Sequence, residues 1–65
     1  MNLRPRPSEA VFEIIRRACR QYPFVTAMEV FNVVKSRCSR QGLEVPTRRQ
    51  FLTAWDDLHP VDKRL

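Results

Sequence analysis

Hydrophobic residues recur at helical spacing in three stretches of the chain, and the first stretch follows Ser8. Apolar side chains spaced three or four residues apart lie on one face of a helix. Ser8 suits the N-cap position, and Pro23 cannot continue a helix. We therefore predict a helix from Ser8 to about Gln21. Its apolar face consists of Val11, Ile14, Ile15, Ala18 and Tyr22, widened by Phe12 and Cys19.

The second stretch opens with a sequence signal for a helix start. Thr26 and Glu29 form a Thr-x-x-Glu pattern, in which the two side chains satisfy each other's backbone amides. Gly42 suits the position just after a helix, where the backbone turns left-handed. We predict a helix from Thr26 to about Gln41. Its apolar stripe is Ala27, Val30, Phe31, Val34 and Cys38.

A third helix is predicted after the short connector that ends at Pro46. Thr47 and Gln50 form a second capping-box pattern, and Pro60 prevents continuation of the helix. The helix extends from Arg48 to Leu58 on this interpretation. Its buried stripe is Phe51, Ala54, Trp55 and Leu58, with Leu52 at the edge.

These elements predict an all-α fold, a three-helix bundle in one small domain. A single glycine among 65 residues argues against the tight hairpins of an all-β fold. Arg4 and Arg6 each precede a proline, which disfavours helix, so residues 1–7 are interpreted as an extended basic arm. Residues 8–60 form the predicted three-helix domain, and residues 61–65 a short tail.

Catalytic and metal-binding chemistry finds little support in the sequence. His59 is the only histidine, and the sequence contains neither a Cys-x-x-Cys motif nor a glycine-rich phosphate loop. Asp56 and Asp57 are neighbours on a helix and point about 100° apart, so they do not form an acid–base pair. We expect neither enzyme activity nor a cofactor or metal.

Apolar runs and cysteine content indicate the cellular setting. The longest apolar runs span only two or three residues, so no membrane segment is expected. Cys19 and Cys38 both lie on apolar helix faces, where buried reduced thiols are the favoured interpretation and a disulfide is the alternative. We predict an intracellular, cytoplasmic location.

Positive charge is concentrated in the first fifty residues. The whole chain has a net charge of +5, and residues 1–50 hold ten Lys and Arg against four Asp and Glu. Residues 51–65 hold two basic against three acidic residues. A cationic surface is the electrostatic footprint of a nucleic-acid binder, but it also serves solubility.

The order of these features resembles the helix-turn-helix domains of winged-helix type found in many bacterial repressors. The similarity covers about residues 11–58: an Ile-Ile-x-x-Ala first helix at 14–18, a capped second-helix start at 24–30, a turn at 42–47 and a third helix at 48–58. The residues after Leu58 are too few for a β-hairpin wing, so a wing-less or minimal form is implied.

The resemblance implies that the third helix enters the DNA major groove with its N-terminal half. Carried over to this chain, it makes Arg48, Arg49, Gln50 and Thr53 the contacts to bases or phosphates. The helical wheel supports an outward position for Arg49, Gln50 and Thr53, together with Asp56, and it places Arg48 nearer the edge. Asp56 and Asp57 would repel phosphates, which restricts the approach to the N-terminal end.

Three further residues outside that helix join the predicted DNA interface. Thr47 caps a helix N-terminus that could hold a phosphate. Arg4 and Arg6 could lie in an adjacent minor groove, as homeodomain arms do. The expected function is thus that of a small regulator of transcription or replication that binds duplex DNA. A homodimer is a possible form of this regulator.

A protein-interaction module, either adaptor or inhibitor, is the alternative function for the same fold. Met28 and Val33 lie off the main stripe of the second helix, and Leu52 lies off that of the third. They are candidate contacts to a protein partner or to a second copy, Met28 and Val33 above all. Packing against the arm or the tail is the other interpretation of Met28 and Val33.

Overall fold

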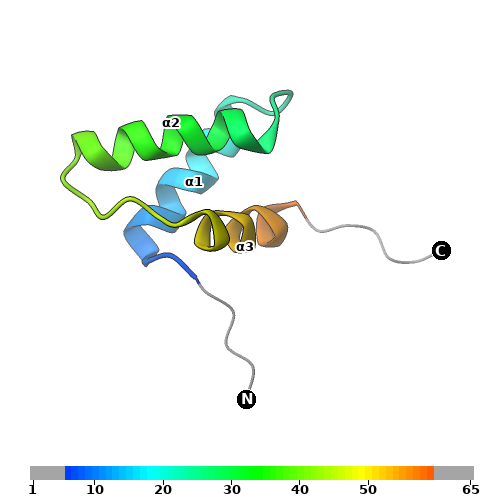
Figure 1. The fold of residues 1–65 in the computed structure, drawn as a ribbon. Coiled ribbons are helices and arrows are strands. Elements are labelled where there is room, and N and C mark those ends of the chain that lie inside the picture. The colour runs from blue at the N-terminus through cyan, green and yellow to red at the C-terminus, as the bar shows by residue number, and fades with distance from the viewer. Residues whose placement is uncertain (1–5, 60–65) are drawn as a thin grey trace, which may run out of the picture.

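The computed structural model describes residues 6–59 and has three helices: α1 (Glu9–Gln21), α2 (Ala27–Arg40) and α3 (Arg48–Leu58) (Figure 1). No strand occurs within residues 6–59. The predicted all-α, three-helix fold is therefore confirmed, and each predicted helix is found within one residue of its expected ends. Arg4, the rest of the arm up to residue 5, and the tail at 61–65 lie outside the described residues.

All three predicted N-caps are present. The Val11 amide donates to Ser8 Oγ at 3.3 Å. At α2, the Glu29 amide donates to Thr26 Oγ1, and the Thr26 amide donates to Glu29 Oε1 at 3.1 Å. A reciprocal pair of the same kind joins Thr47 and Gln50 at α3. These bonds satisfy amides that a helix leaves without an internal partner, and so they fix where each helix begins.

The predicted glycine after α2 ends that helix in a Schellman motif. Gly42 has φ +71°, which residues with a Cβ rarely adopt. Its amide donates to the Ser39 carbonyl at 3.2 Å, and the Leu43 amide donates to the Cys38 carbonyl at 2.8 Å. The turn sends the chain back toward α3 and sets Leu43 against the core.

The cap of α2 gives a stability prediction. We expect Thr26→Ala to lower the free energy of unfolding by about 1 kcal/mol, because the Glu29 amide loses its acceptor. For a domain of this size that loss corresponds to a Tm lower by about 4–8 °C. Thermal denaturation followed by circular dichroism measures it. Thr26→Ser keeps the hydroxyl and should unfold close to the wild type; an equal loss in both variants would contradict the capping role.

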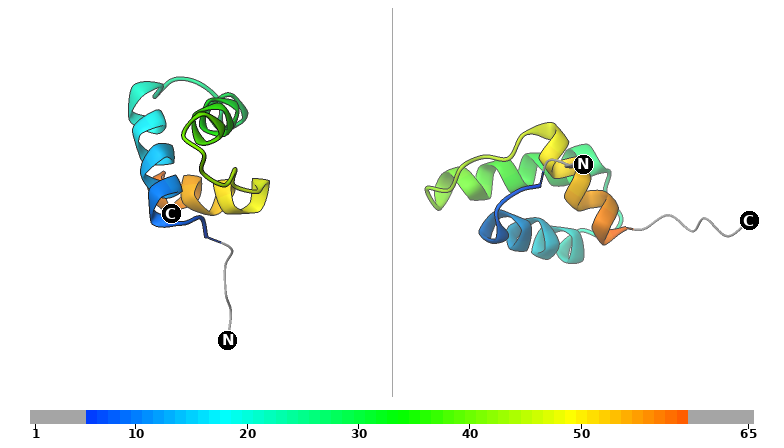
Figure 2. Two further views of the ribbon diagram at one scale, coloured as in Figure 1. Left: turned by 90° about the vertical axis from the view of Figure 1, so that its left-hand side faces the viewer. Right: turned by 90° about the horizontal axis from the view of Figure 1, so that it is seen from below.

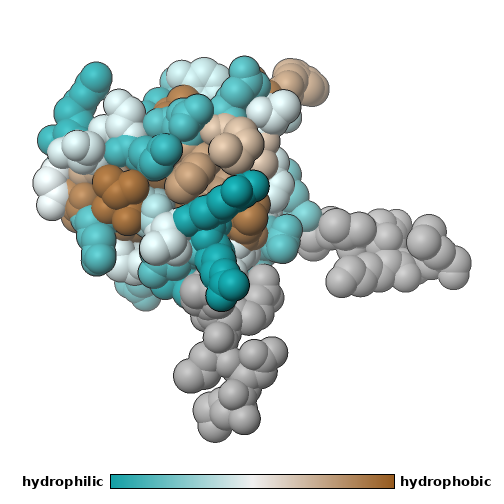
Figure 3. Space-filling model, in the orientation of Figure 1, coloured by the Kyte–Doolittle hydropathy of each residue, from teal (hydrophilic) through white to brown (hydrophobic). Residues whose placement is uncertain are grey.

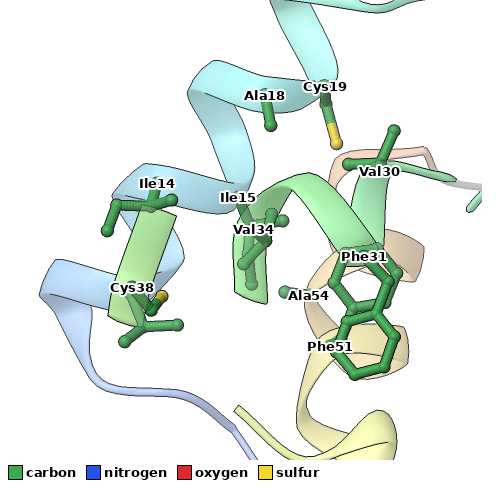
Figure 4. Close-up of a cluster of buried hydrophobic side chains, with 11 residues drawn as sticks. Ile14, Ile15, Ala18, Cys19, Val30, Phe31, Val34, Cys38, Phe51 and Ala54 are labelled. Atoms are coloured by element: carbon green, nitrogen blue, oxygen red, sulfur yellow. The ribbon is translucent and has the colours of Figure 1, made fainter. Parts of the chain in front are cut away.

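Helices α1 and α2 run in roughly opposite directions and cross obliquely, and α3 crosses both (Figure 1 and Figure 2). The core occupies the space between all three helices, and each helix contributes to it the stripe that its sequence predicts. Figure 4 shows these side chains meeting. The largest fully buried ones are Phe51, Ile15, Val30, Val34 and Cys38.

Aromatic contacts join α3 to α2. The ring centroids of Phe31 and Phe51 lie 4.8 Å apart, and those of Phe51 and Trp55 lie 5.8 Å apart. His59 then stacks on Trp55 at 4.2 Å. Trp55 packs against the core but remains partly exposed. Phe51 is therefore the central side chain that holds α3 in place, with Trp55 at the margin.

The two cysteines are free and buried, as the favoured interpretation predicts. In Figure 4, Cys19 lies beside Val30, while Cys38 lies at the other end of the α1/α2 interface beside Ile14. Ile15 and Val34 lie between the two cysteine side chains in that view. The structure does not support the disulfide alternative.

Burial also predicts slow thiol chemistry. Desolvation raises the pKa of the Cys19 and Cys38 thiols, which keeps them protonated at neutral pH. We expect iodoacetamide to label the folded protein far more slowly than the same protein in guanidinium chloride, as followed by mass spectrometry. Labelling at equal rates in both conditions would contradict the buried positions.

Candidate nucleic-acid interface

The N-terminal turn of α3 brings two predicted DNA contacts together. Arg48 and Arg49 are adjacent and exposed, directly after the Thr47 cap. Leu52 and Asp56 follow at spacings that continue the same outward stripe, and Leu52 is 38% exposed. The outward face of α3 is thus basic at its N-terminal end, apolar in the middle and acidic at the far end. Figure 3 shows hydrophobic side chains exposed among hydrophilic ones on one face of the molecule.

Both polar atoms of the Gln50 side chain form hydrogen bonds within the protein. It is half-buried, and its Oε1 accepts from the Thr47 amide at 2.9 Å. Its Nε2 donates to the Arg6 carbonyl at 3.4 Å. Reading adenine takes both the oxygen and the nitrogen of an amide side chain. Base recognition by Gln50 would therefore require both of these bonds to break.

The expectation that Thr53 faces outward is wrong, because its exposure is only 8%. Gln50, Thr53 and Asp57 share one stripe of α3, and Arg6 contacts both Gln50 and Asp57. The chain segment before α1 therefore runs along this stripe. A helical wheel considers a helix alone, so it could not show that this segment lies there.

Arg6 lies against α3. Its Nη2 atom is 3.1 Å from Asp57 Oδ2, in an ion pair of two partly exposed side chains. The pair compensates the negative charge of Asp57. Asp56 lies instead in the outward stripe with Arg49, where its charge faces any polyanion that approaches α3.

The two predicted partner contacts on α2 lie on different sides of the helix. Met28 is 50% exposed, whereas Val33 is half-buried and packs against the core. Five residues separate them, which turns the second side chain by about 140° from the first. Met28 and Val33 therefore do not form one patch.

One exposed aromatic residue was not among the predicted sites. Phe24 lies in the loop between α1 and α2 and is 98% exposed. An aromatic residue beside Pro23, outside both apolar stripes, is the sequence signal that could have identified it. Leu52 on α3 and Val45 in the connector before α3 are further large apolar residues left open to solvent.

The described part of the chain contains neither a metal-site cluster nor a membrane-spanning helix. Within residues 6–59, no group of three or more His, Cys, Asp or Glu side chains is placed to hold a metal ion. None of the three helices has the length and apolar character needed to cross a membrane. Neither a family model, nor a curated protein, nor a solved structure matches this chain.

Proposed function

We propose that the protein binds duplex DNA through the N-terminal turn of α3, inserted in the major groove. The observation that carries the proposal is the pair of exposed arginines, Arg48 and Arg49, at the N-terminus of a helix whose outward stripe is open to solvent. A helix N-terminus carries a partial positive charge and favours phosphate. The two arginine side chains and the helix N-terminus therefore both attract the DNA backbone to the first turn of α3.

The available groups fit base and backbone contacts. Arginine donates two hydrogen bonds to guanine O6 and N7, and an apolar side chain such as Leu52 can contact the thymine methyl group. The capping box uses the amides of Thr47 and Gln50, so those of Arg48 and Arg49 lie outside it and can face a phosphate. Compared with the DNA contacts predicted from the sequence, the proposed interface on α3 retains Arg48 and Arg49, includes Leu52 in addition, and no longer includes Thr53.

A regulatory role in transcription or replication, inside the cell, follows from this chemistry as part of the proposal. One short helix gives limited sequence specificity. A homodimer that reads two half-sites would supply more. Arg4 lies outside the described residues, and Arg6 would have to leave Asp57 to enter a minor groove.

Salt dependence tests the proposal. Fluorescence anisotropy would follow the protein titrated into labelled random-sequence duplex DNA at about 50 mM and about 200 mM salt. With about four phosphate contacts, counterion release predicts roughly a hundredfold loss of affinity between these conditions. Absence of binding at the lower salt concentration would contradict the proposal.

The acidic end of α3 gives a separate prediction. Asp56→Asn should raise the affinity for duplex DNA by roughly fivefold, or about 1 kcal/mol, because it removes a negative charge from the outward stripe. The anisotropy titration above measures the change. Glu9→Gln removes one negative charge from α1 and should change affinity less than about twofold. Equal effects from both variants would show that net charge alone matters.

A protein-interaction module is the second candidate function, favoured by the exposed Phe24. Aromatic side chains that fill a partner's pocket contribute much of the energy at protein interfaces. Phe24 is 98% exposed, and the half-exposed Met28 follows four residues later. If the protein does not bind DNA at low salt, the interaction with a protein partner through Phe24 and Met28 becomes the better-supported function.

A further inference from the structure

A groove lined with arginines lies between α1 and the C-terminal half of α2. It encloses about 550 Å³, and its lining among residues 6–59 comes from α1, α2 and the turn after α2. Helix α3 does not contribute to it. The lining residues are Ala10, Glu13, Ile14, Arg17, Arg37, Arg40, Gln41 and Leu43.

Two of its three arginines are held in place by neighbours. Arg37 Nη2 donates to Gln21 Oε1 at 2.6 Å, which ties α2 to the end of α1. Arg17 Nε lies 3.3 Å from Glu13 Oε2, and its side chain is 75% exposed. Arg40 is exposed and has neither a hydrogen bond nor an ion pair with residues 6–59 through its guanidinium. The guanidinium groups therefore retain donors for a ligand.

Apolar side chains lie among these charges. Ile14 is a core residue, Leu43 packs against the core, and both line the groove. A second hollow of about 370 Å³ shares Arg37 and Arg40 and is also lined by Val33. Val33, Arg37 and Arg40 lie along one side of α2. We call the two hollows together the cationic groove.

We infer that the cationic groove binds an acidic protein segment that also carries aliphatic side chains. Guanidinium groups bind carboxylates with two parallel hydrogen bonds, and Ile14, Val33 and Leu43 offer contact to aliphatic groups. A phosphate backbone fits less well, because it has no aliphatic side chains to contact Ile14, Val33 and Leu43. Glu13 also lines the groove, where ion pairs with Arg16 and Arg17 offset its negative charge. The Arg16 guanidinium lowers the pKa of Glu13 through a hydrogen bond.

This inference does not rest on the proposed DNA function, since α3 takes no part in the groove. The sequence alone did not show which surface Val33 belongs to. In the structure, Val33 lines the same hollow as Arg37 and Arg40, and Met28 does not. A protein with both surfaces would link DNA bound at α3 to an acidic partner bound between α1 and α2.

The test uses a fluorescein-labelled peptide made of glutamate and leucine. Anisotropy should show binding to the wild type and to Arg48→Ala/Arg49→Ala, with at least tenfold weaker binding to Arg37→Ala/Arg40→Ala, on the scale of charge-assisted hydrogen bonds. The two double variants lose equal charge, and circular dichroism verifies their helix content. Equal weakening in both variants, or no binding to the wild type, would overturn the inference.

Two competitors identify the class of ligand. An unlabelled peptide of glutamate alone should compete at least several-fold more weakly than the mixed peptide, because the apolar contacts are lost. Equal competition would overturn the aliphatic part of the inference. A single-stranded oligonucleotide that displaces the peptide better than the unlabelled mixed peptide does would overturn the protein assignment in favour of nucleic acid.

Discussion

Replacing Arg48 and Arg49 together by alanine is expected to lower the affinity for duplex DNA by at least about thirtyfold. Each arginine that pairs with a guanine contributes about 1–3 kcal/mol, and two such losses multiply in the equilibrium constant. If one or both contact phosphates instead, the slope of log affinity against log salt becomes shallower by about 0.9 for each. Anisotropy titrations at several salt concentrations measure both quantities.

The matched control for this prediction is Arg37→Ala/Arg40→Ala, on α2. It removes the same charge from the groove between α1 and α2. We expect it to change DNA affinity by less than about fivefold, because its charges act only at long range. Two double variants with equal DNA affinity would mean that the N-terminal turn of α3 is not the contact.

Replacing Phe51 by alanine is expected to lower the free energy of unfolding by about 3–5 kcal/mol. Phe51 is 1% exposed and contacts the rings of Phe31 and Trp55. Loss of a buried phenyl ring costs about 3–5 kcal/mol. A domain of 65 residues has a total stability of roughly 3–10 kcal/mol, so the substitution would remove between about a third and all of it. Urea denaturation followed by circular dichroism measures the change.

Leu52→Ala provides the comparison, since Leu52 is the next residue on α3 and is 38% exposed. Its removal should change the free energy of unfolding by about 0.5 kcal/mol, as for an ordinary surface substitution. The wide difference between two adjacent apolar residues follows from which face of α3 each occupies. Similar losses at both positions would contradict the packing of α3.

The helices were predictable because their signals are local. Thr26 with Glu29, and Thr47 with Gln50, form caps within a single turn, so the sequence contains all that is needed to place each start. Gly42 marks the end of α2 for the same reason, since the bonds that close the turn join residues 38, 39, 42 and 43. The apolar stripes then determine which face of each helix is buried.

The candidate site was less predictable because it depends on contacts between distant residues. Thr53 is only 8% exposed, and its neighbours on the same side of α3, Gln50 and Asp57, contact Arg6, more than forty residues earlier in the chain. A helical wheel for α3 contains neither contact. The exposed positions of Arg48 and Arg49, in contrast, follow from their place in the first turn after the cap, where the core stripe has not yet begun.

The groove between α1 and α2 shows the same distinction. Its arginines were visible in the sequence as part of the net charge, but Arg17 and Arg37 are twenty residues apart and belong to different helices. Only the packing of α1 against α2 brings them together. Sequence periodicity predicts the faces of single helices, and the pairing of those faces requires the structure.

Chemical-shift mapping by NMR tests the central claim most directly. Amide spectra of ¹⁵N-labelled protein, recorded with and without duplex DNA, show which residues the DNA contacts. The proposal predicts that the largest shifts lie in the first turn of α3 and its cap, from Thr47 to Leu52, with little change around Arg37 and Arg40. Shifts concentrated between α1 and α2, or absent at Arg48 and Arg49, would contradict DNA binding by α3.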